Sequence, residues 1–200
     1  MKPHTEYNFE LQFPLDQINQ IASRYPIDGV EDGLYKNRAA IVDRGYLTKT
    51  ELEKIAYWKT PRSKSRIANN NDDYVNEITS IALSTKNERI RIEILTLLEG
   101  VSWPTASVLL HFYHKEKYPI IDFRALFSLN CENIKPDEYD FPFWKSYTNY
   151  TRSLSDDLNI DMRTLDRALW QYSKEALNGK IHVTVFKMLS EPFTSPKPLT

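Results

Sequence analysis

Cysteine is almost absent from this sequence. Cys131 is alone among 200 residues, so the chain can form neither an internal disulfide nor a cysteine metal site. Glycine is scarce too, with five residues, and no glycine-rich loop of the kind that cradles phosphates is present. No apolar run approaches the roughly 20 residues that span a membrane, and residues 1–13 lack the basic-then-apolar layout of a signal peptide. We therefore expect a cytoplasmic, intracellular protein with no membrane partner.

An excess of positive charge is also missing. The formal net charge is −1, which argues against a protein that binds nucleic acid over its whole surface. The charge is unevenly spread, however. Between Arg44 and Arg66 seven basic residues face two acids, whereas between Cys131 and Asp161 three basic residues face seven acids. A chain with this asymmetry can still present one positive face to DNA.

Apolar residues at helical spacing, separated by caps and turns, predict an all-α fold of about nine helices. A length of 200 residues suits one globular unit, or two interleaved lobes that share a core. A capping box at Thr48–Glu51 opens a helix to about Trp58, and further helices are expected over 15–25, 34–43, 74–83, 142–154 and 162–177. Residues 1–13 are expected to form an extended arm, 181–189 a strand or a last helix, and 190–200 a loose tail.

The segment 87–129 is the centre of the sequence. A first helix places Ile90, Ile94, Leu97 and Leu98 on one stripe, and Gly100 ends it in a left-handed conformation. A second helix, from Thr105 to about His114, is apolar nearly all round and should be buried.

The turn between these two helices can bind an anion. Residues 100–103 present backbone N–H groups at the positive end of a helix dipole, which suits a phosphate. Asp122 opens a third helix. Periodicity alone favours an N-cap role for Asp122, and a functional acid is the alternative.

These residues also carry a family pattern. The stretches LEGVSWPTASVLL and PIIDFRALFSL resemble the helix-hairpin-helix DNA glycosylases of the endonuclease III and alkyladenine glycosylase type. That pattern is a hairpin of the form L-P-G-V-G-x-x-T-A-x-x-h-L, where h is apolar, followed after about a dozen residues by an acid behind two apolar residues. The residues on the pattern are Leu98, Gly100, Val101, Thr105, Ala106, Leu110 and Asp122.

The sequence departs from the family in three places. Ser102 replaces the second hairpin glycine, which is tolerable if its φ is negative. Pro104 stands where bifunctional members carry a Schiff-base lysine. The four C-terminal cysteines of the iron–sulfur members are absent. The resemblance therefore implies a glycosylase without lyase activity and without an iron–sulfur cluster or other cofactor.

The resemblance also assigns roles to residues. It makes Asp122 the catalytic carboxylate, and it places a DNA phosphate on the hairpin at Gly100, Val101, Ser102, Trp103 and Thr105. The aromatic side chains Trp58, Trp103, Tyr118 and Phe123 are candidates to contact a base outside the stack, although core packing is the more common role for each.

The basic segment from Trp58 to Arg66 has two interpretations. Its Lys59, Arg62, Lys64 and Arg66 form either a clamp on DNA phosphates or an ordinary solvated loop. His111 and His114 lack a third ligand nearby, so we expect no metal site.

Two main function classes remain. The first is a monofunctional glycosylase that acts as a monomer on double-stranded DNA with a damaged or modified base. The second is a non-catalytic helix-hairpin-helix DNA-binding module, in which Asp122 is only a cap. A protein-interaction domain on the same scaffold is a third class, suggested by the near-neutral charge.

Overall fold

A computed structural model describes the backbone of residues 7–190 and the side chains of residues 7–179. The described residues are mostly helical and include no β-strand. The all-α prediction is confirmed, although the α-helices are more numerous than nine. The predictions for residues 1–6 and for the tail 191–200 lie outside the described residues.

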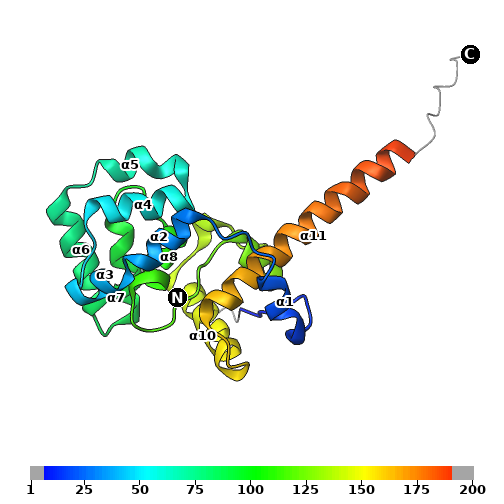
Figure 1. Cartoon of the computed structure of the whole chain (residues 1–200), viewed down its shortest axis with the longest axis horizontal. Helices are drawn as coiled ribbons and strands as arrows, with labels where there is room; N and C mark the ends of the chain where they lie inside the picture. Colours follow the sequence, from blue (N-terminus) through cyan, green and yellow to red (C-terminus); the bar gives the residue numbers. More distant parts are fainter. Residues whose placement is uncertain (1–6, 191–200) are drawn as a thin grey trace, which may run out of the picture.

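The chain is a succession of mostly short helices (Figure 1). The α-helices are α1 (Ile18–Ala22), α2 (Gly29–Lys36), α3 (Arg38–Arg44), α4 (Lys49–Lys59), α5 (Lys64–Ala68), α6 (Asp72–Ser84), α7 (Glu88–Glu93), α8 (Trp103–Tyr113), α9 (Phe123–Ser128), α10 (Phe141–Asp157) and α11 (Met162–Ser190). Four 3-10 helices accompany them: η1 (Leu15–Gln17), η2 (Pro61–Ser63), η3 (Ile94–Leu97) and η4 (Pro136–Glu138).

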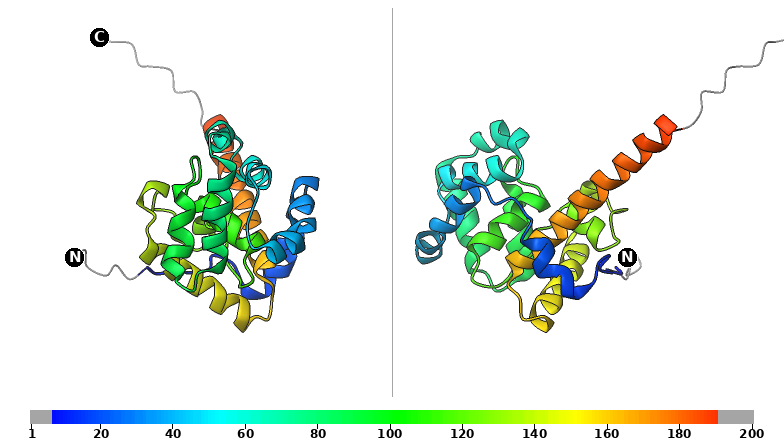
Figure 2. Two further views of the ribbon diagram at one scale, coloured as in Figure 1. Left: turned by 90° about the vertical axis from the view of Figure 1, so that its left-hand side faces the viewer. Right: turned by 45° about the vertical axis from the view of Figure 1, so that its right-hand side comes forward.

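The helices pack in two groups. Helices α2 to α8 form one group, in which α4 packs on α2, α5, α6 and α8. The other group joins the two ends of the chain, because α1 and α9 both pack on α11 and α10 contacts it too. Buried apolar side chains of both groups form one hydrophobic core. Figure 2 shows the later part of α11 extending away from this body.

The predicted apolar stripe of the first hairpin helix is correct for Leu98, which is buried, and for Ile94, which packs against the core, but it is wrong for Ile90 and Leu97. Ile90 is 45% exposed and Leu97 60% exposed, whereas Ile92, Leu95 and Leu98 are buried. The reason is that α7 gives way to η3 after Glu93. A 3-10 helix has three residues per turn, so side chains three apart share a face. An expectation based on 3.6 residues per turn therefore wrongly places Leu97 on the buried face.

Two other helix boundaries differ from the predictions. The single helix expected over 34–43 is divided between α2 and α3, and α2 begins earlier, at Gly29, because the side chain of Asp28 accepts a hydrogen bond from the Glu31 N–H at 2.8 Å. The stop expected at Asn178–Gly179 does not occur, since α11 runs through it to Ser190. A glycine inside a helix costs only about 1 kcal/mol, so it does not by itself end one. The ambiguous segment 181–189 is therefore helical.

Several local predictions are confirmed. Thr48 and Glu51 form the capping box of α4, and Gly45 ends α3 at a φ of 81°. The described part of the N-terminal arm is extended and bonds to the end of α9, through Glu10 N–H to the Leu129 carbonyl at 3.0 Å. None of the described helices is long and apolar enough to cross a membrane.

Candidate functional site

The hairpin turn has the geometry that its residues predict. Gly100 has a φ of 79°, and Ser102, with a φ of −107°, is the N-cap of α8. The second glycine of the pattern is therefore not required here. The first helical bond runs from the Ala106 N–H to the Ser102 carbonyl at 2.8 Å, and Pro104 has no N–H. The N–H groups that precede Ala106 in the first turn of α8 have no intrahelical acceptor, as in any helix start.

Gly100 also lets α5 approach the hairpin. A Cβ atom on Gly100 would lie 2.8 Å from Ile67 Cγ1 and 3.1 Å from Arg66 Cβ. Its positive φ and this close approach both require glycine. The basic segment before and within α5 is therefore held directly against the hairpin.

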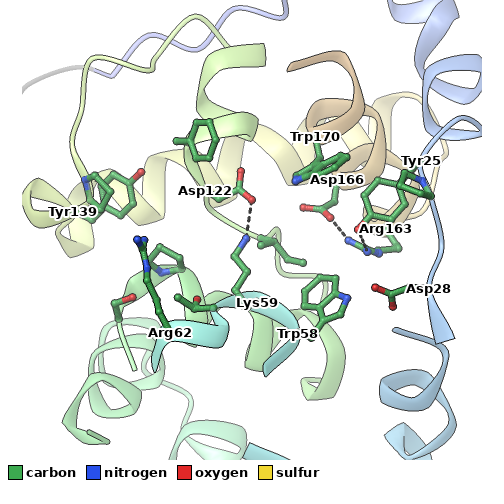
Figure 3. Close-up of a pocket in the computed structure, with 17 residues that line it drawn as sticks. Tyr25, Asp28, Trp58, Lys59, Arg62, Asp122, Tyr139, Arg163, Asp166 and Trp170 are labelled. Atoms are coloured by element: carbon green, nitrogen blue, oxygen red, sulfur yellow. Dashed lines mark hydrogen bonds and ion pairs between the residues drawn. The ribbon is translucent and has the colours of Figure 1, made fainter. Parts of the chain in front are cut away.

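A pocket of about 540 Å³ opens between the two groups of helices (Figure 3). The hairpin, the end of α4, the start of α9 and the first turns of α11 all contribute to its wall. The residues that line it are Tyr25, Pro26, Asp28, Trp58, Lys59, Thr60, Arg62, Ser102, Pro104, Ile120, Asp122, Phe123, Pro136, Tyr139, Arg163, Asp166 and Trp170. Such a cavity, partly aromatic and with a few convergent charges, is the usual form of a ligand site.

Asp122 is bound at both carboxylate oxygens. Its Oδ1 accepts a hydrogen bond from the Ala125 N–H at 2.9 Å, which caps α9. Its Oδ2 lies 2.7 Å from Lys59 Nζ. Burial alone would raise the pKa of Asp122, but the Lys59 ammonium and the N–H groups of Ala125 and Arg124 outweigh it and hold that pKa below its usual value. The side chain is 17% exposed, so Asp122 is an anion at the wall of the pocket.

Asp122 can therefore cap α9 and act as a functional acid at the same time. The cap uses Oδ1, while Oδ2 and its Lys59 partner line the pocket. Figure 3 shows Lys59 extending from α4 to Asp122 across the cavity. The N-cap role favoured by periodicity is confirmed, and it leaves the second role open.

Besides Asp122 and Asp28, whose Oδ1 caps α2, the pocket holds a third acid that the sequence patterns did not reveal. Asp166 on α11 pairs with Arg163, and Arg163 also lies 2.7 Å from the buried Glu31 of α2. Trp170 lies one turn farther along α11 and lines the same pocket. The spacing of Arg163, Asp166 and Trp170 places them on one helical face, and polar residues on the inward face of a helix were the available signal.

The candidate aromatic residues separate into two sets. Trp58 and Phe123 line the pocket, and Phe123 is 56% exposed. Tyr118 does not line it: this residue is buried, and its ring stacks on Trp144 with centres 5.7 Å apart. Trp103 also packs against Trp144, at 6.4 Å. The structure therefore does not place Tyr118 or Trp103 where they could hold a base.

The four basic candidates do not act as one loop. Pro61 ends α4 as expected, but the residues after it form η2 and α5. Lys59 turns into the pocket, and Arg62 is at its rim. Lys64 and Arg66 are exposed beyond it. Arg62, Lys64 and Arg66 remain available to contact phosphates, whereas Lys59 belongs with Asp122.

His111 and His114 make ordinary internal hydrogen bonds. His111 Nδ1 bonds the Tyr118 carbonyl at 2.6 Å, and His114 Nδ1 accepts the Glu116 N–H at 3.0 Å. Among the residues that the structure describes, no cluster of three His, Cys, Asp or Glu side chains is placed to hold a metal ion.

The chain was also compared with models of protein families, with curated proteins and with solved structures, and none of them matches it. The geometry of the pocket and the hairpin is therefore the basis for a functional assignment.

The salt dependence of DNA binding tests the role of Arg62, Lys64 and Arg66, which we call the basic rim. If Arg62, Lys64 and Arg66 bind phosphates, replacing each with alanine should weaken binding to all sequences alike. The slope of log K against log salt should flatten by about one unit for each phosphate that is no longer neutralised. Lys117→Ala is a matched control, because Lys117 follows the end of α8 opposite the hairpin and pairs with Asp156 at 2.7 Å. An unchanged slope in the triple variant would return this segment to ordinary surface.

Proposed function

We propose that this protein is a monofunctional DNA glycosylase. It binds double-stranded DNA, takes a damaged or modified base out of the stack, and hydrolyses the N-glycosidic bond of that base. The observation that carries the proposal is the position of Asp122, an ionised carboxylate at the wall of an aromatic pocket that the hairpin borders. The helix-hairpin-helix pattern in the sequence supports the same reaction.

The chemistry needs an anion beside the sugar. As the glycosidic bond breaks, positive charge develops on the sugar and the bonding electrons leave with the base. A fixed carboxylate stabilises that charge and orients or deprotonates the attacking water. Because Oδ1 of Asp122 is held by the helix N-terminus, Oδ2 is the oxygen that meets the sugar or the water.

Lys59 has a positioning role in this proposal. Its ammonium keeps Asp122 ionised and fixes Oδ2 before substrate arrives, with 2.7 Å between the two groups. DNA brings phosphates into the same region, and they compete for the ammonium. The carboxylate then has less of its charge neutralised at the moment when the sugar cation forms.

The hairpin and the aromatic residues complete the site. A phosphate next to the target nucleotide binds the N–H groups at the start of α8, which fixes the sugar relative to Asp122. The flipped base occupies the pocket, which Trp58 and Trp170 line.

A non-catalytic DNA-binding module is the second candidate. The observation in its favour is that Asp122 satisfies the N-terminus of α9 at a normal capping distance of 2.9 Å, so the acid has a structural reason to be present. In that case the hairpin and the basic rim bind DNA, and the pocket releases no base.

Replacing Asp122 with asparagine separates the two candidates. Asparagine caps a helix about as well as aspartate, but it carries no charge for the sugar and is no base. If Asp122 is catalytic, Asp122→Asn should fold and bind DNA while single-turnover base release falls by about two to four orders of magnitude. Loss of the ion pair should also lower the melting temperature, because the largely shielded Lys59 ammonium is left without its partner.

Asp140→Asn is the matched control. Asp140 caps α10 with the same geometry, accepting the Phe143 N–H at 2.9 Å, and it does not line the pocket. It should retain full base release. Full activity in Asp122→Asn would remove this carboxylate from the reaction.

Lyase activity should be absent. Pro104 has no amine, and the amine of Lys59 is engaged in an ion pair with Asp122 at 2.7 Å, so neither should form an imine with the sugar. We expect abasic sites to stay uncut and borohydride to trap no protein–DNA adduct during turnover. A trapped adduct that disappears in Lys59→Ala would show instead that Lys59 is a nucleophile.

A further inference from the structure

Asp166 is, with Asp28 and Asp122, one of three carboxyl groups that line the pocket, and the proposed hydrolysis does not yet use it. Its side chain is nearly buried, with the residue 8% exposed, and it lines the cavity together with Trp58 and Trp170. Figure 3 shows Asp166 projecting from α11 beside Asp122, on the side of the cavity where Arg163 lies.

Asp166 shares the guanidinium group of Arg163 with Glu31. Arg163 contacts Glu31 through Nη2 at 2.7 Å and through Nε at 3.1 Å, and it pairs with Asp166 through Nη1. Glu31 also pairs with Arg167. Glu31 therefore pairs with two guanidinium groups, those of Arg163 and Arg167, whereas Asp166 pairs with that of Arg163.

We propose that Asp166, positioned by Arg163, donates a proton to the base as it leaves, so that the substrate is a neutral modified base. This inference rests on the proposed glycosylase function and assigns the second half of the reaction. Asp122 stabilises the positive charge on the sugar, and Asp166 protonates the leaving base.

Burial favours a protonated carboxyl group at Asp166. It raises the pKa of Asp166 to about 6 against the opposing effects of Arg163 and Lys59, and the nearby anions Asp122 and Glu31 add to the rise. Asp122, by contrast, stays ionised. Two acids whose pKa values are pushed apart in one site suit the separate roles of acid and base. The titratable groups that face Asp166 are Arg163 of α11, Glu31 and Tyr35 of α2, Lys59 of α4, Asp122 before α9, Tyr147 of α10 and Tyr25 before α2.

The step balances in atoms and electrons. The bond between the sugar C1′ and the base nitrogen breaks, and its electron pair stays on the base. The carboxyl proton of Asp166 moves to an acceptor atom of that base, leaving Asp166 ionised. Water bonds to C1′ and gives a proton to Asp122. Exchange with solvent then restores both acids, and no oxidant or other reactant is needed.

The aromatic faces argue for a neutral base over a cationic one. Arg163 Cζ already lies 5.4 Å from the Trp58 ring centre and 5.2 Å from that of Tyr25. Arg124 lies 5.0 Å from the ring centre of Trp170. Cations of the protein thus already use the negative ring faces, and an alkylated, positively charged base would meet Arg163. A neutral base is a poor leaving group, so it needs the proton from Asp166.

The test uses five duplexes with the full-length protein. Four carry a neutral base, namely uracil, hypoxanthine, 8-oxoguanine or 5-hydroxymethylcytosine, and one carries the cationic 7-methylguanine. Free base is measured in single turnover from pH 5 to 8. We expect release of at least one neutral base, with a rate that falls about tenfold per pH unit above 6 as Asp166 loses its proton. Any release of 7-methylguanine should lack this fall.

Asp166→Asn tests the residue itself. Release of the neutral base should drop by about 10² to 10⁴-fold and lose its dependence on pH, while 7-methylguanine is affected little. Glu175→Gln is the control on the same helix, since Glu175 forms an exposed pair with Arg24 at 2.7 Å. The wild-type pH profile decides the question if Asp166→Asn does not fold.

The outcomes distinguish this inference from the proposed function. Neutral-base release that is flat with pH, or that survives Asp166→Asn, would overturn the role of Asp166 and leave the glycosylase intact. Release confined to 7-methylguanine would overturn it as well. Absence of release from all five duplexes, with DNA binding retained, would count against the glycosylase and therefore against both.

Discussion

The ion pair between Lys59 and Asp122 is the interaction on which the site depends. It joins α4 of one group of helices to the start of α9 in the other, with 2.7 Å between Nζ and Oδ2. Both side chains are largely shielded, at 14% and 17% exposure. Removing one partner would leave the other charge poorly solvated, which costs more than the pair itself contributes. The pair thus keeps the carboxylate ionised, fixes the position of its Oδ2 and joins the two walls of the pocket.

Two further constraints organise the surroundings of this pair. Gly100 brings α5 against the hairpin, because any side chain there would meet Ile67, and so a basic rim adjoins the turn that presents N–H groups. On the opposite wall, Arg163 is fixed by Glu31 and Asp166. The cavity therefore has cations and acids from both groups of helices, with aromatic faces between them. In our proposal, this arrangement holds a phosphate, a sugar and a base at three adjacent places.

The sequence predicts those parts of the site that are local. The conformation of Gly100 and the cap made by Asp122 follow from turn and capping chemistry within a few residues, and both are confirmed. The pairing of Lys59 with Asp122 spans 63 positions, so no local rule could reveal it. Asp166 was missed for the same reason, since its role depends on which face of α11 turns inward. The exposed Leu97 shows that even a local pattern fails when the helix changes its period.

The direct test of the glycosylase assignment is a search for its product. The full-length protein is incubated with duplexes that each carry a different damaged or modified base, and mass spectrometry is used to detect free base. We predict that at least one base appears in solution while the sugar–phosphate backbone stays intact. Tight binding to these duplexes with no free base from any of them would contradict the account and identify the chain as a DNA-binding module.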